Sequence, residues 1–133
     1  MSGQERRAPS AQDIETIARA TLASLPPEFL AHTGEIVLIV EDFADDETLD
    51  ALGIESPFDL TGVYHGRPIG EKSSMASGAM PDRIHLYRRA ILDEWVEDGE
   101  DLETLVRHIV IHEVGHHFGL SDDDMHRLED EAE

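Results

Sequence analysis

The sequence contains no cysteine, so this 133-residue chain can form neither disulfide bonds nor thiolate metal sites. Any transition metal must therefore be held by His, Asp or Glu side chains. Aromatic residues make up only 5% of the chain and hydrophobic residues 40%, which predicts a modest core of aliphatic side chains. A chain of this length fits one domain, and we expect residues 1–133 to form a single unit with residues 1–9 disordered.

Basic residues are also scarce: 10 Lys and Arg stand against 30 Asp and Glu, a formal net charge of −20. Such a charge repels nucleic acid and anionic membrane surfaces, so we expect neither as a partner. The same acidity is typical of a soluble, well-charged surface and by itself indicates no function. No stretch of 18 apolar residues occurs, and no apolar stretch follows the N-terminal arginines, so we expect a cytoplasmic protein.

Hydrophobic spacing predicts most of the secondary structure. Residues 11–25 have apolar residues at three- and four-residue intervals, with Ser10 and Asp13 as an approximate capping box, and prolines end this helix. The β-branched run at 36–40 indicates a buried strand. The rest of the chain predicts strands at 61–65 and 83–87, a short helix ending near Gly99, a longer helix from Leu102 to Phe118 and a terminal helix from Ser121.

The connections are less regular. Residues 42–59 are acidic and broken by glycine and proline, so we expect an irregular segment with at most one helical turn. Residues 66–81 are rich in Gly, Ser and Pro and are expected to form a mobile loop. In the strand at 83–87, Ile84 and Leu86 should form its one buried face. This order of elements predicts an α+β domain with one small sheet.

The longer helix carries a metal-binding pattern. His112 and His116 are four residues apart, which places their Cβ atoms roughly 5–6 Å apart on one helix face, close enough to share a zinc ion. Glu113 would then lie beside the metal and could accept a proton from a zinc-activated water. The pattern HExxH therefore indicates zinc hydrolysis with Glu113 as general base.

The third metal ligand is less clear from the residues alone. Gly119 can adopt positive φ and turn the chain back toward the metal, which would make Asp122 the third ligand. Asp122 also fits the acidic first turn of a terminal helix, where His126 and Glu129 share its face and are rival ligands. His117 points away from the histidine pair and is the weaker choice.

Other polar residues receive structural interpretations. His108 lies one turn before His112 on the same face and could contact the site without binding the metal. The strands contain further groups that could donate to an oxyanion, but packing is their commoner role, and we assign them no catalytic function. These groups are Tyr64, His65, His85 and Tyr87.

The pattern His112-Glu113-x-x-His116-x-x-Gly119-x-x-Asp122 resembles the extended signature of the metzincin branch of the zincin metallopeptidases. The sequence is more closely similar to the small bacterial zincin-like proteins called minimal zincins. This likeness includes IVLIVED, GVYHG and PDRIHLYRRAI and covers roughly residues 35–128. It implies a small zincin-like α+β domain, with one short mixed sheet packed on the active-site helix and zinc held by the two histidines and Asp122.

One departure from the larger metzincins concerns the C-terminus. Only eleven residues follow Asp122, so we expect neither their separate C-terminal subdomain nor their Met-turn. Together the patterns predict a zinc-dependent metallopeptidase acting on a peptide or protein substrate. Two alternatives stay open: a metal-stabilised binding module without catalysis, and a zinc hydrolase of a non-peptide bond. The sequence does not predict the oligomeric state.

Overall fold

The computed structural model describes residues 8–27, 29, 30, 36–65, 82–119, 123 and 127. No helix within these ranges is both long and apolar enough to cross a membrane. The described elements are, in chain order, α1 (Ala11–Ala23), β1 (Val37–Glu41), α3 (Asp46–Leu52), the short 3₁₀ helix η2 (Pro57–Asp59), β2 (Gly62–His65), β3 (Arg83–Tyr87), α4 (Arg88–Asp98) and α5 (Leu102–Phe118).

The described strands form one mixed sheet in the order β1-β3-β2. Strand β3 pairs in parallel with β1 and antiparallel with β2, which confirms the expected α+β fold with a short mixed sheet. The strand predicted at residues 36–40 is present as β1, but it is buried only in part. Because β3 takes the central position, β1 lies at an edge, where Leu38 is buried but Val37 is 42% exposed.

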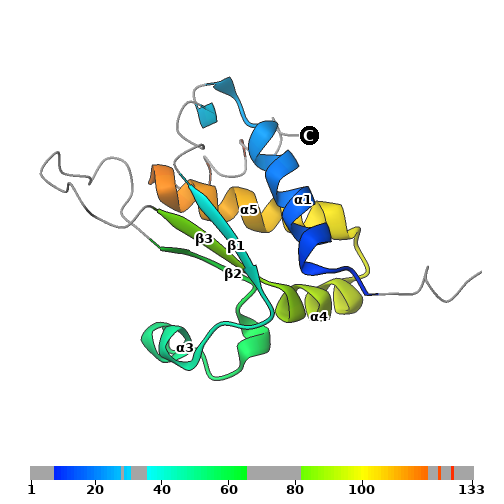
Figure 1. The fold of residues 1–133 in the computed structure, drawn as a ribbon, viewed down its shortest axis with the longest axis vertical. Helices are drawn as coiled ribbons and strands as arrows, with labels where there is room; N and C mark the ends of the chain where they lie inside the picture. The colour runs from blue at the N-terminus through cyan, green and yellow to red at the C-terminus, as the bar shows by residue number, and fades with distance from the viewer. Residues whose placement is uncertain are drawn as a thin grey trace, which may run out of the picture.

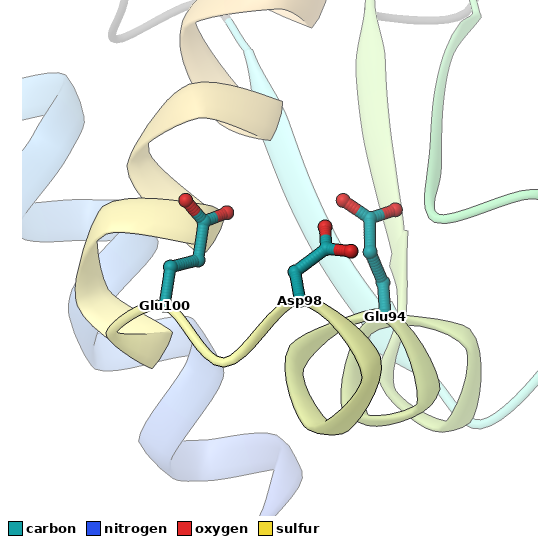
Figure 2. A group of neighbouring side chains, drawn as sticks. All are labelled: Glu94, Asp98 and Glu100. Carbon is teal, nitrogen blue, oxygen red and sulfur yellow. The ribbon is translucent and has the colours of Figure 1, made fainter.

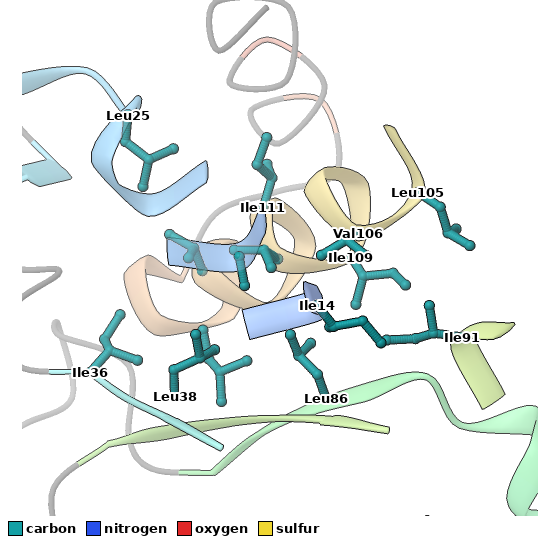
Figure 3. Close-up of a cluster of buried hydrophobic side chains, with 14 residues drawn as sticks. Ile14, Leu25, Ile36, Leu38, Leu86, Ile91, Leu105, Val106, Ile109 and Ile111 are labelled. Carbon is teal, nitrogen blue, oxygen red and sulfur yellow. The ribbon is translucent and has the colours of Figure 1, made fainter. Parts of the chain in front are cut away.

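Helices α1 and α5 cover one face of the sheet, and α3 lies on the opposite side (Figure 1). On the α5 side, aliphatic side chains from the sheet point toward both helices and form the main core (Figure 3). Burial of these side chains is the main source of stability expected for a fold of this size. The most deeply buried members are Ile14, Ala18, Ile84, Leu86, Ile91, Val106, Val110, Ile111 and Val114.

The opposite face of the sheet is more ordered and more covered than the sequence suggested. Residues 42–59 include the seven-residue helix α3, about two turns, in place of the single turn expected. The carboxylate of Asp45 accepts a hydrogen bond from the Thr48 amide at 2.8 Å and so caps this helix. Leu49 then packs in a second cluster with Tyr87, which is only 2% exposed. The expected buried face of β3, with Ile84 and Leu86, is therefore joined by Tyr87 on the other face, where Arg83 and His85 are only partly buried.

The predicted helix ends agree with the structure. Ser10 and Asp13 form a complete capping box at the start of α1. Gly99 and Gly119 adopt left-handed conformations, with φ of 73° and 68°, and end α4 and α5. Outside the described residues lie the predicted loop at 66–81, residues 1–7 of the N-terminal segment and, apart from Asp123 and Arg127, the predicted terminal helix from Ser121.

Candidate metal centre

Helix α5 lies close to the edge strand β2 at Gly62. A Cβ atom added there would come within 3.0 Å of Cγ2 of Ile109 and 3.2 Å of Cδ2 of Leu86. A side chain at this position would therefore push the helix away from the sheet. The glycine allows a close approach that holds the following turn of α5, with the histidine motif, against β2.

His112 and His116 have the ring spacing that one metal ion requires. Their ring centroids are 5.1 Å apart and the ring planes meet at 66°. Two imidazoles bound to one tetrahedral zinc have centroids roughly 5 Å apart, given Zn–N distances of about 2.0–2.1 Å. The ring of His108 stacks on that of His112, with centroids 6.3 Å apart and an interplanar angle of 28°. These rings are too far apart and too parallel to bind one metal ion together. His108 thus supports the packing of His112.

Glu113 lies between this histidine pair and the sheet. Its residue is 7% exposed, and Oε1 lies 3.2 Å from Nδ1 of His116 without the geometry of a hydrogen bond. Among the described residues Oε1 has no hydrogen-bond partner. The backbone amide of Tyr64 in β2 does donate to the Glu113 carboxylate. An orphaned buried oxygen beside two histidines fits a site that a metal and its water would complete.

Burial raises the pKa of Glu113 above its ordinary value of 4.5, while the nearby His112 and the Tyr64 amide lower it less. The direction follows from desolvation, which penalises the charged carboxylate. A carboxyl group with a raised pKa holds a proton more readily and is better matched to proton transfer near neutral pH. The local environment therefore suits Glu113 to acid–base work.

The register of the sheet explains why the Tyr64 amide can donate to Glu113 and not to β3. The Tyr87 amide donates to the Thr61 carbonyl at 2.9 Å, so every second pair after it, Val63 with His85 among them, is hydrogen-bonded in this antiparallel ladder. Tyr64 and Gly62 fall between those pairs, and their backbone groups point off the edge. No sequence pattern signals this amide, because it is a backbone group whose direction depends on the register.

Not every predicted residue can be placed. Asp122, His126 and Glu129 lie outside the described residues, as does the side chain of His117. The assignment of Asp122 as third ligand therefore stays a prediction. Gly119 ends α5 as expected, which satisfies one condition for the chain to turn back. Of the strand residues set aside as packing groups, His65, His85 and Tyr87 lie on the face opposite α5, while Tyr64 faces the helix.

A separate acidic cluster lies where α4 meets α5. Oxygen atoms of Glu94, Asp98 and Glu100 lie within 4.8 Å of one another, and their side chains point in one direction (Figure 2). Burial, followed by repulsion from Asp98 and Glu100, raises the pKa of Glu94. Within the described part of the chain this is the one group of three metal-type ligands so close together. The four-residue spacing of Glu94 and Asp98, one helical turn, is the sequence signal for this cluster.

Comparison with known proteins agrees with the helix motif. The family model described as zincin-like metallopeptidase matches residues 33–132, which include the sheet, α4 and α5 with its histidines. No curated protein matches the sequence significantly. The family implies zinc binding, and the histidine spacing and the buried Glu113 fit that metal. The match covers most of the chain, and the protein therefore belongs to the zincin-like metallopeptidase family.

Proposed function

We propose that this protein is a zinc-dependent peptidase in which His112 and His116 hold the metal and Glu113 is the general base. The observation that carries the proposal is the buried Glu113 carboxylate, with one oxygen unpartnered among the described residues, beside two imidazoles 5.1 Å apart. Asp122 is proposed as the third ligand on the basis of the motif. When bound, zinc supplies a Lewis acid that polarises a carbonyl group and acidifies water.

The protein's own groups have distinct tasks in this proposal. The Tyr64 amide holds the Glu113 carboxylate in place, so that Oε1 stays free to accept a proton. The raised pKa of Glu113 makes its carboxylate a stronger base for that proton, which Glu113 then passes to the leaving amine. Because Glu113 is almost fully buried, its interaction with the reacting groups is screened little by solvent.

The outer edge of β2 supports a peptide as substrate. Gly62 directs its backbone groups away from β3, the Tyr64 amide on the same edge donates to Glu113, and no other described strand pairs with this edge. An extended peptide can add to such an edge through main-chain hydrogen bonds. Since the Tyr64 amide also reaches Glu113, a peptide along β2 would lie close to the proposed base.

The test is cleavage of a peptide library by zinc-loaded protein, compared between Glu113→Gln and Glu103→Gln. Glu103 lies on the same helix but its side chain is 70% exposed, so this control makes the same chemical change away from the motif. We expect Glu113→Gln to lose cleavage at least a hundredfold and still bind zinc, and Glu103→Gln to keep both. Cleavage that survives chelation, or that is unchanged in Glu113→Gln, would contradict the proposal. Zinc binding without cleavage of any peptide would instead favour the non-catalytic module.

A further inference from the structure

A second pair of histidines lies on the face of the sheet away from α5. The register pairs His65 with Arg83 and Val63 with His85, so His65 and His85 are diagonal neighbours on one face of β2 and β3. Their ring centroids are 5.0 Å apart. This nearly equals the spacing of the motif pair and the roughly 5 Å expected for two imidazoles on one tetrahedral metal.

These histidines open into a hollow between the sheet and α3. The hollow has a volume of about 560 Å³, enough for a metal ion with several waters. Polar groups come from both sides, with Asp45, Glu47 and Thr48 near α3 and His65, Arg83 and His85 from the sheet. Both histidines and the acidic residues Asp45 and Glu47 therefore line one concave surface, in which the protein would supply two imidazoles to an ion and water the rest.

A hydrogen bond fixes how His85 can bind a ligand. Nδ1 of His85 lies 2.9 Å from Oε1 of Glu41, and because a carboxylate only accepts, Nδ1 carries the proton and donates. In the neutral ring, Nε2 then keeps its lone pair for a metal. Histidine ligands commonly donate their other nitrogen to a carboxylate in this way, which orients the ring and raises its basicity. Glu41 thus has the role of an outer partner to His85, a residue that orients the metal ligand without binding the metal itself.

The charges around the hollow favour a cation. Three carboxylates, Glu41, Asp45 and Glu47, outnumber the one guanidinium of Arg83. Burial, followed by repulsion from His85 and Arg83, lowers the pKa of His65 below its ordinary value of 6.5. Imidazole nitrogen suits zinc, copper and nickel, whereas calcium and magnesium prefer sites made of oxygen.

We propose that His65 and His85 form a second site for a divalent transition metal such as zinc, with Glu41 orienting His85 and water completing the coordination. Such an ion would cross-link the edge strand β2 to β3. The proposal is independent of the peptidase activity, because the two sites lie on opposite faces of the sheet.

The experiment uses a background variant, His112→Gln with His116→Gln, which removes the motif pair. Zinc chloride is titrated into the metal-free protein, and imidazole ¹⁵N signals are followed by long-range NMR. We expect the Nε2 signal of His85 and the ring signals of His65 to shift together and saturate. Under the same conditions, magnesium chloride should leave both unchanged.

Two further substitutions in that background test the assignment by calorimetry. We expect His65→Gln to weaken zinc binding at least tenfold, and Glu41→Gln to weaken it roughly tenfold, as is typical for loss of an outer partner. Glu41 is 52% exposed, so its variant should fold even if His65→Gln does not. The matched control is Glu103→Gln, which should bind as the background does. Zinc-insensitive signals of both rings would show that the two rings only pack together, and equal affinity in Glu41→Gln and the background would show that Glu41 does not orient His85.

Discussion

The two histidine pairs have almost the same spacing but are built differently. His112 and His116 lie on one helix with centroids 5.1 Å apart, whereas His65 and His85 come from two strands with centroids 5.0 Å apart. The helix pair has a buried carboxylate beside it with an oxygen that lacks a partner among the described residues. The strand pair has a half-exposed carboxylate already bonded to one ring. The two pairs thus have similar ring spacing but different carboxylates: Glu113 is suited to accept a proton, and Glu41 is suited to orient a ligand.

The largest effect should come from removing a motif histidine. We expect His112→Ala to lose the zinc at α5 and to lower peptide hydrolysis by about a thousandfold, because the Lewis acid is lost with its ligand. The imidazole signals of His65 and His85 should keep their response to zinc. Activity and zinc content measured on the same sample check this. Full activity in a zinc-free His112→Ala sample would show that the histidine motif is not needed for hydrolysis.

This difference between the pairs also explains what the sequence could predict. His112 and His116 lie one helical turn apart, so their spacing in the chain fixes their spacing in the fold. His65 and His85 are separated by twenty positions, and only the strand register brings them together. The strands themselves were predictable, β1 from its β-branched run and β3 from its apolar alternation, but the pairing was not. The same limit hid Tyr64, whose contribution is a backbone amide.

The acidic segment at 42–59 shows a second limit. Its composition suggested an irregular connection, yet Asp46–Leu52 forms a helix. The local signal was the Asp45 cap, while the deciding interaction is Leu49 packed in one cluster with Tyr87 and Ala90 from distant parts of the chain. Tertiary burial outweighed weak local propensity there.

The close approach of α5 to β2 gives the second prediction. Gly62→Val should destabilise the fold by about 1–3 kcal/mol, because its Cβ would meet Cγ2 of Ile109 at 3.0 Å. The same change should lower activity in the protein that remains folded, since it moves the motif turn away from the Tyr64 amide. Urea denaturation and initial rates measure the two effects.

A control for this prediction is Gly53→Ala. Gly53 has open space around a Cβ but a φ of 69°, so we expect a loss of about 1 kcal/mol from backbone strain and no effect on the rate. Equal losses of rate in the two glycine variants would argue against the helix–strand contact as the cause.

A third prediction separates the side chain of Tyr64 from its backbone. The Tyr64 hydroxyl donates to Oδ2 of Asp82 at 3.0 Å, and Asp82 is only 5% exposed. Tyr64→Phe should cost about 1–2 kcal/mol of unfolding free energy through loss of this hydrogen bond. Thermal and urea unfolding of the metal-free variant are the measurements. A variant as stable as the parent would mean that the bond contributes nothing net.

The smallest effect concerns the stability cost of the buried Glu113. Its pKa in the fold is raised above 4.5. The contribution of the protonated carboxyl group to the free energy of unfolding is therefore complete below about pH 4.5, and it is lost as the pH rises through the folded pKa. At neutral pH the charged carboxylate is therefore a penalty to the metal-free protein. We expect Glu113→Gln to raise the melting temperature at pH 7 by a few degrees, with the gain vanishing toward pH 4.

The melting temperatures of Glu113→Gln and the parent are measured by calorimetry between pH 4 and pH 8, in samples treated with a chelator. Taking the difference between the two proteins cancels the contributions that their other acidic residues share. Glu103→Gln is again the control, because its exposed pair with Arg107 should be worth little at any pH. If Glu113→Gln melts at the same temperature as the parent throughout this range, desolvation does not destabilise the site. Stabilisation that grows with pH would instead mean that the carboxylate is held at a cost to folding, as expected of a group placed for chemistry and not for stability.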